Sequence, residues 1–199
     1  QLNAAEARTA FYVDFEGDDD APPVLLGILR THTQQYVVDP SFRLLGPAYL
    51  ELRQALATVV ARAEKQDRRI ASWSEHDLEV VRSLTKEPGL IRRFEARYAN
   101  GQALAARWAT RAGSIAAPAG GELLAYLELV GVEAPASAVP GQTSATIRSL
   151  RQRLDAGRLP TEQQAERWAD LLERTRYDCE GMRAVGIRAA TDLERIDRR

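Results

Sequence analysis

The sequence predicts an α/β fold in which one mixed sheet is flanked by helices. Three short segments rich in β-branched and aromatic residues come first, and the short links between them are typical of an antiparallel meander. A fourth segment of this kind follows the first helical pattern, and nearly everything after Pro88 has the apolar spacing of helices. This order indicates a sheet whose first three strands are antiparallel and are followed by a parallel strand.

Each element is predicted by a local pattern. Residues 17–23 (GDDDAPP) are typical of a turn, and we expect Asp18, Asp19 and Asp20 to be solvated there rather than to be ligands. The alternative is that they lie near the rim of a site. The Gly, Ala, Pro and Ser content of 114–121 and 131–144 indicates loops. The expected strands are 10–16, 24–29, 35–38 and 68–73, and the expected helices are 48–63, 74–84, 89–100, 101–113, 123–130, 144–156 and 161–195.

The composition fits one globular domain over 1–199, with 88–143 as a helical insertion. A hydrophobic content of 45% and a charged content of 28% are ordinary, and a net charge of −1 argues against a strongly basic nucleic-acid binder. The lone cysteine, Cys179, fits a reducing compartment, so we expect a cytoplasmic protein. No apolar run is long enough to span a membrane. Because the sequence begins at Gln1 without a Met, we interpret it as a piece of a longer protein.

Two acids interrupt the first expected strand, whose sequence is FYVDFEG at 11–17. On a strand, residues two apart point to the same face, so Asp14 and Glu16 lie side by side. Neighbouring carboxylates repel each other unless a cation lies between them, and a hard divalent cation takes oxygen ligands. The pair is therefore a candidate metal site. The alternative is a pair of acids on an edge strand that faces water.

Two further acids fall where an apolar pattern predicts something else. Asp178 lies on the apolar stripe of the last helix, one turn from Met182, and a buried lone carboxylate is costly unless it is paired or bound to metal. The alternative is a phase error of one residue, which would turn Asp178 to solvent beside Arg174. Asp77 lies on the buried side of its helix, but its spacing from Ser74 also fits a capping box.

The positions of these four acids along the chain resemble those of a known family. An Asp-x-Glu on a first strand, an Asp after a later strand and an Asp in a late helix resemble the ribonuclease H-like superfamily, specifically its DEDD exonuclease branch. The segments FYVDFEG…PVLLGIL…QYVVDPS are similar to that family's opening strands, SEHDLEVVRSL to its second motif and LLERTRYDCEGMRAV to its third. The likeness is greatest to the ribonuclease H-like domains of predicted RecB-family nucleases. It covers most of the chain and is least clear over 88–143.

The resemblance implies a nuclease that hydrolyses phosphodiester bonds of DNA or RNA, as a 3′–5′ exonuclease with two Mg²⁺ or Mn²⁺ ions about 4 Å apart. It implies a nucleic acid as the partner, no membrane, and action either alone or inside a larger nuclease or repair protein. Carried over residue by residue, Asp14 would bridge both ions, Glu16 and Asp178 would complete one site, and Asp77 would complete the other.

The chain departs from the family at the position that orients the attacking water. Exonucleases of this branch have a His five residues, or a Tyr four residues, before the last Asp, and this chain has Glu173 and Arg174 there. Arginine cannot act as a base, but it can hold a phosphate. Arg174 and His76, which adjoins Asp77, are therefore candidate substrate-binding residues. The departure also leaves an alternative function, a catalytically degenerate domain of the same fold that binds nucleic acid or a partner protein.

Arginines recur at helical spacing through the expected insertion and beyond it. Phosphate contacts need such groups, so they predict a groove for nucleic acid. The alternative is the ordinary solvated face of long helices. The residues are Arg92, Arg93, Arg97, Arg107, Arg111, Arg148, Arg151 and Arg153.

Overall fold

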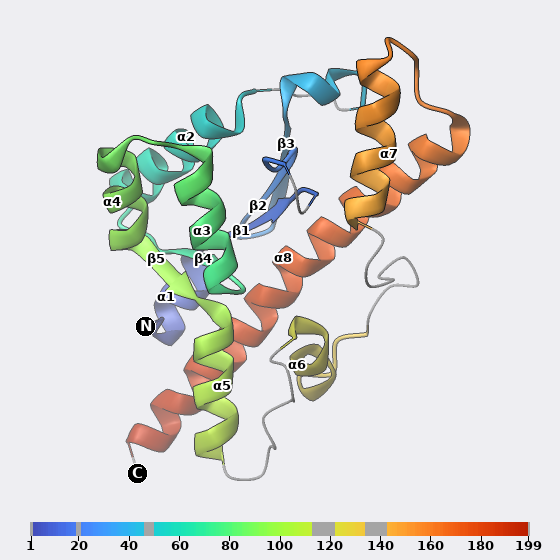
Figure 1. The fold of residues 1–199 in the computed structure, drawn as a ribbon. Helices are drawn as coiled ribbons and strands as arrows, with labels where there is room; N and C mark the ends of the chain where they lie inside the picture. The colour runs from blue at the N-terminus through green and yellow to red at the C-terminus, as the bar shows by residue number, and fades with distance from the viewer. Residues whose placement is uncertain (1, 19–20, 46–49, 113–121, 134–142, 199) are drawn as a thin grey trace.

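The centre of the molecule is a mixed sheet of five strands (Figure 1). The structure is a computed structural model that describes residues 2–18, 21–45, 50–112, 122–133 and 143–198. Along the sheet the strands are ordered β3-β2-β1-β4-β5, with β2 antiparallel to both β1 and β3 and with β4 parallel to both β1 and β5. The α/β class, the antiparallel first three strands and the parallel fourth strand are thus confirmed. The strands are β1 (Phe11–Glu16), β2 (Leu25–Arg30), β3 (Thr33–Val38), β4 (Ile70–Ser72) and β5 (Tyr98–Asn100).

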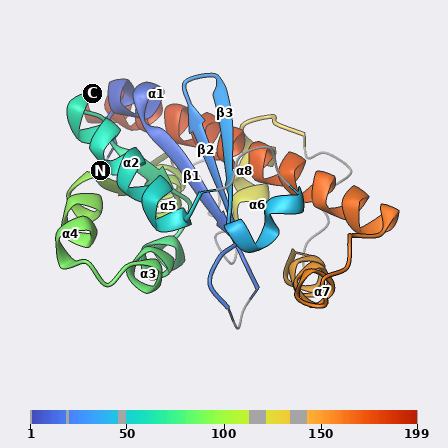
Figure 2. The same ribbon diagram turned by 90° about the horizontal axis from the view of Figure 1, so that it is seen from above.

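Helices cover both faces of this sheet (Figure 2). One face packs mainly against α2 and α4, with Val81 of α3 at the edge of the same core. The long helix α8 crosses the other face together with α1, α5 and α6, while α7 packs against α8 and η1. The helices are α1 (Ala4–Thr9), α2 (Leu52–Lys65), α3 (Glu75–Leu84), α4 (Pro88–Arg97), α5 (Gly101–Ala112), α6 (Leu123–Leu129), α7 (Thr143–Asp155), α8 (Glu162–Asp197) and the 3₁₀ helix η1 (Pro40–Leu45).

The period-two pattern of β1 decides which of its side chains meets which layer. Phe11 and Val13 are buried in the core under α2 and α4. Tyr12 is buried on the opposite face, where its hydroxyl donates a hydrogen bond to the Ala7 carbonyl oxygen at 2.7 Å. Asp14 follows Tyr12 on that same face, so the strand directs its carboxylate toward α8.

Helix α8 is the longest element and connects two cores. Thr161 and Gln164 form a capping box at its start, as the position of Thr161 after Pro160 suggests. Its buried stripe includes Trp168, which packs with α7, and Val185, which packs under the sheet. Although α8 has 36 residues, neither it nor any other described helix is long and apolar enough to cross a membrane.

Three short elements differ from the sequence prediction. Residues 98–100, expected to end a helix, form β5, because pairing with β4 outweighs the local helical spacing. The helix α1 was not expected, although Asn3 and Glu6 form a capping box there. The 3₁₀ helix η1 was not expected either.

The stretch 88–143 is not purely helical, since it contains β5 as well as α4, α5 and α6. That this stretch is an insertion stays a prediction. The expected loops at 114–121 and 131–144 lie mostly outside the described residues.

Candidate metal centre

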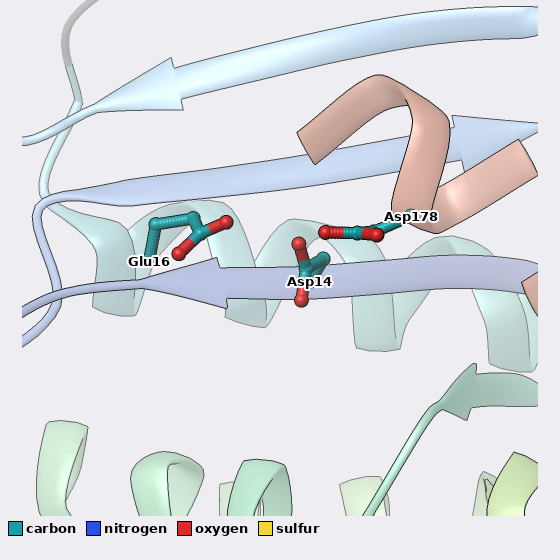
Figure 3. A group of neighbouring side chains, drawn as sticks. All are labelled: Asp14, Glu16 and Asp178. Carbon is teal, nitrogen blue, oxygen red and sulfur yellow. The ribbon is translucent and has the colours of Figure 1, made fainter. Parts of the chain in front are cut away.

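Three of the four predicted acids come together between β1 and α8. Asp14 and Glu16 lie in the C-terminal half of β1, and Asp178 lies in the middle of α8. One carboxylate oxygen from each of the three residues lies within 4.8 Å of the others. Figure 3 shows the three side chains directed toward one another. We call this group the acid triad.

A glycine lets α8 approach the sheet at this point. Gly27 of β2 is the cross-strand partner of Asp14. A Cβ atom at Gly27 would overlap with the Cγ2 methyl of Thr175 and would lie 3.5 Å from Cys179 Sγ. Both of those residues belong to α8 and are fully buried. The close contact therefore depends on the missing side chain at Gly27, and it brings the next turn of the helix, with Asp178, to Asp14.

Asp14 is the most constrained member of the acid triad. Its Oδ2 atom is buried and accepts no hydrogen bond from the described residues. Burial, together with the nearby negative charges of Glu16, Asp178 and Asp77, raises the pKa of Asp14 well above its usual range. A buried carboxylate oxygen without a donor is costly, and a bound cation would satisfy it.

Burial also disfavours the charged forms of the other two acids, Glu16 and Asp178. Burial raises the pKa of Glu16 to about 7, and the Arg174 guanidinium opposes that rise. The Glu16 Oε1 atom lies 3.4 Å from the Thr175 hydroxyl, which also donates to the Leu171 carbonyl oxygen at 2.9 Å. Burial likewise raises the pKa of Asp178, again opposed by Arg174, whose Nε lies 3.6 Å from Asp178 Oδ2. Asp178 thus faces the triad and also lies beside Arg174, but it is not turned to solvent, since its side chain is only 21% exposed.

Asp77 lies outside the acid triad but close enough to affect it. It is buried in the first turn of α3, at the end of β4. Its carboxylate accepts a hydrogen bond from the Ser74 backbone N–H at 3.1 Å, which is the capping-box contact that the sequence predicted. Burial raises the pKa of Asp77, and its charge in turn raises the pKa values of Asp14 and Glu16.

A pocket of about 790 Å³ opens beside the acid triad. Its walls come from the end of β1, the turn after it, α3, the start of α7 and α8. Phe15 and Val80 give it an apolar side, and Glu16 reaches it from the triad. Both predicted substrate-binding residues, Arg174 and His76, line the same pocket. The pocket therefore joins a candidate metal site to cationic and apolar surface.

Sequence reasoning missed three residues that shape this centre. Gly27 carries a readable signal, since a glycine inside the apolar strand VLLGIL is typical of a close backbone approach. Thr175 also had a signal, because it falls on the buried stripe of α8. Thr143 had none. It contacts the Arg174 side chain, whose Nη1 donates to its hydroxyl at 3.3 Å, across two helices that the sequence does not place together.

Asp18 is not solvated, contrary to the first interpretation of this turn, and it lines the pocket beside the acid triad, in agreement with the alternative. Its side chain is only 5% exposed and forms an ion pair with Arg151 at 3.4 Å, which ties the turn after β1 to α7. The prediction for Asp19 and Asp20 lies outside the described residues.

Several of the arginines that suggested a groove are held in ion pairs on the helix surface. Arg93 pairs with Glu64 at 2.5 Å and Arg97 with Asp67 at 2.5 Å, so both tie α4 to the end of α2. Arg111 pairs with Asp197 in the same way between α5 and α8. These contacts favour the alternative for Arg93, Arg97 and Arg111, in which they lie on the ordinary solvated face of their helices.

Comparisons with protein-family models, with curated proteins and with solved structures found no significant match to this chain. The inference to function therefore rests on the site. Its donor set consists of carboxylate oxygens alone, which suits Mg²⁺ or Mn²⁺ better than softer metals. The orphaned Asp14 Oδ2 atom fits such an ion.

Proposed function

We propose that this chain is a metal-dependent nuclease with a ribonuclease H-like fold, and that it hydrolyses phosphodiester bonds of DNA or RNA as a 3′–5′ exonuclease. The observation that carries the proposal is the acid triad, in which three carboxylates share one small volume and Asp14 Oδ2 has no partner among the described residues. Acids gathered in this way repel one another, and a site for divalent cations explains why the fold tolerates the arrangement.

Two features support the ribonuclease H-like assignment. The sheet has antiparallel first strands followed by a parallel strand, with helices on both faces, as the resemblance implies. The residues matched to the first and third motifs, which are far apart in the chain, lie together in space. The residue matched to the second motif, Asp77, lies near enough to raise the pKa of Asp14.

Each acid has a role in this proposal. Asp14, Glu16 and Asp178 hold one divalent ion, and Asp77 with Asp14 holds a second. Two such ions, Mg²⁺ or Mn²⁺, supply an activated water and stabilise the oxygen that leaves the phosphorus. The protein contributes the fixed positions of the carboxylates, because β1 and α8 are both rigid elements buried on their inner sides.

The pocket supplies the contacts to the substrate. Arg174 and His76 lie on its wall and provide donors for phosphate oxygens. Phe15 and Val80 provide apolar surface against which a base or sugar can pack. Glu173 stands where the family can have a His and Arg174 where it can have a Tyr, and Arg174 cannot accept a proton from the attacking water.

That same observation favours a second candidate function. A ribonuclease H-like domain that has lost the residue that orients the water could bind nucleic acid or a partner protein without cutting it. The two candidates differ in one respect that can be measured. The enzyme needs the acid triad to bind metal, and a degenerate domain does not.

Calorimetric titration of Mn²⁺ and Mg²⁺ into the parent chain at pH 8 tests the proposal. We expect binding by the parent and none by Asp14→Asn, whose neutral amide keeps the shape of the side chain. Asp170→Asn removes an acid from the exposed face of α8 and is the matched control, so it should bind as the parent does. No binding by the parent would exclude the two-metal mechanism and leave the degenerate domain.

A nuclease assay then separates the remaining possibilities. Single strands of DNA and RNA, each labelled at the 5′ end or at the 3′ end, report both the preferred nucleic acid and the direction of cutting. A 3′–5′ exonuclease shortens a 5′-labelled strand one nucleotide at a time and releases the label of a 3′-labelled strand as a mononucleotide at once. Metal binding without cleavage of any strand would contradict the enzyme and favour the binding domain.

A further inference from the structure

The turn between β1 and β2, described at residues 17–18 and 21–23, forms one wall of the pocket and is contacted by an arginine of α7. Asp18 and Pro22 of this turn line the pocket, and Arg151 does not. Arg151 Nη1 lies 3.4 Å from Asp18 Oδ2, and Arg151 Nη2 donates to the Pro22 carbonyl oxygen at 3.4 Å. One planar guanidinium thus contacts two residues of the turn at once, which the fork of an arginine favours over the compact ammonium of a lysine.

The buried core beneath α7 fixes the position of the Arg151 side chain. Its guanidinium lies 6.0 Å from the centre of the Phe42 ring, and Phe42 is fully buried where it stacks on Trp168. A guanidinium over an aromatic face is a favourable arrangement. Ile147 and Leu150 of the same helix are fully buried in this core as well. Arg151 therefore connects the turn to a rigid part of the fold.

The turn itself is closed tightly at its base. The Val24 backbone N–H donates to the Glu16 carbonyl oxygen at 2.9 Å. A Cβ atom at Gly17 would lie only 3.0 Å from Pro23 Cα, so the two sides of the turn are in close contact there. The Asp18 side chain is only 5% exposed, and a carboxylate so deeply buried is costly without a cation near it. Contacts from α7 therefore help to set the position of this wall.

The acid triad is held by other contacts. Glu16 is positioned by the ladder between β1 and β2, where its partner is Leu25, and Asp178 is carried by α8. The wall that faces the turn includes Thr143 at the start of α7, about two helical turns before Arg151. The ion pair of Arg151 thus fixes the spacing of two pocket walls without holding any of the three acids.

We propose that Arg151 is a positioning residue of the substrate pocket, which holds the turn after β1 against α7 and so sets the spacing of the walls that receive a nucleotide. The inference rests on the proposed function and adds a residue that acts through the turn rather than by touching the substrate or the metal ions. A preformed pocket binds more tightly than one that the ligand must first order. Loss of Arg151 should therefore weaken nucleotide binding and leave metal binding unchanged.

The test titrates Mn²⁺ alone, and then thymidine 5′-monophosphate at saturating Mn²⁺, into the parent and into Arg151→Met at pH 8. Methionine keeps an unbranched side chain over Phe42 and removes the charge. We expect the parent's Mn²⁺ affinity and about tenfold weaker binding of the mononucleotide, because the ligand must now order the wall. Thermal unfolding checks that the variant is folded at the temperature of the titration.

Asp18→Asn probes the same ion pair from the other side and distinguishes positioning from a direct phosphate contact. If Arg151 acts through the turn, Asp18→Asn also weakens binding of the mononucleotide. If Arg151 instead binds the phosphate itself, removal of a negative charge from the pocket wall leaves that binding unchanged or makes it tighter, and the inference is overturned. Asp18→Asn is the milder change, so it carries the test alone if Arg151→Met does not fold.

Arg158→Met is the matched control. It removes an exposed arginine just after α7 that does not line the pocket, so both affinities should equal those of the parent. Unchanged mononucleotide binding by Arg151→Met overturns the inference, and loss of Mn²⁺ binding by this variant does so too, since it would show a general structural role. A parent that binds Mn²⁺ but not the mononucleotide overturns the inference and leaves the metal site intact. No Mn²⁺ binding by the parent overturns the proposed function itself.

Discussion

Asp14 and Gly27 are cross-strand partners on β1 and β2, and the missing side chain of Gly27 is what allows α8 to lie against the sheet beside Asp14. The acid triad depends on this contact, because Asp178 reaches Asp14 only while α8 stays close. The geometry of this candidate metal centre thus depends on a residue that carries no functional group. A substitution at Gly27 therefore tests the geometry of the acid triad without changing any of its three acids.

Gly27→Ala should weaken both the fold and the metal site. The new Cβ would overlap with the Cγ2 methyl of Thr175, and overpacking of this kind costs about 1–3 kcal/mol. We expect a lower urea midpoint and weaker Mn²⁺ binding, since α8 must move away from β1. Thr175→Ser removes only that methyl, so the double variant should recover both properties. Gly89→Ala is the control, because a Cβ there meets nothing within 4 Å. Mn²⁺ binding by Gly27→Ala at the parent's affinity would contradict the account.

Without metal, the chain should be more stable at pH 5 than at pH 8. Burial raises the pKa of Glu16 from 4.5 to about 7, so this group contributes stability that is fully present below pH 4.5 and is lost as the pH rises through 7. The loss from Glu16 is at most about 3 kcal/mol, and the raised pKa of Asp14 acts in the same direction. Urea unfolding at several pH values in the presence of a chelator measures it.

Glu16→Gln isolates the contribution of this residue to the pH dependence. The variant cannot ionise at position 16, so the fall in stability between pH 5 and pH 8 should become smaller. Saturating Mn²⁺ should have a similar effect on the parent, since a bound cation favours the deprotonated acids. A pH dependence that is the same in the parent and in Glu16→Gln would show that Glu16 is not a strained acid.

Local periodicity was sufficient to single out all three residues of the acid triad. Asp14 and Glu16 share a face because strands have a period of two, and Asp178 was found because it interrupts an apolar stripe of helical period. These signals depend only on residues close in the chain. The α/β class and the strand directions followed from the same patterns, because the lengths of the links between apolar segments restrict which strands can pair.

The remaining features depend on contacts between distant segments, which local patterns do not encode. Tyr98 belongs to a strand only because β4 is available to pair with it, and the preceding helical spacing gave no sign of the change. The contact between Arg174 and Thr143 requires the relative position of α7 and α8. The ion pair of Asp18 with Arg151 likewise joins a turn to a helix that comes much later in the chain.

Asp77 has a structural role and a proposed chemical role, and two substitutions separate them. Ser74→Ala removes the side chain of the capping residue while leaving the Asp77 carboxylate in place, so it should lower stability by about 1 kcal/mol and leave metal binding unchanged. Asp77→Asn keeps the size of the side chain but removes its charge. We expect it to reduce the calorimetric stoichiometry from two Mn²⁺ ions to one, because Asp14, Glu16 and Asp178 still hold the first. Two ions bound by Asp77→Asn would assign Asp77 to capping alone, and loss of both ions would show that the two sites fill only together.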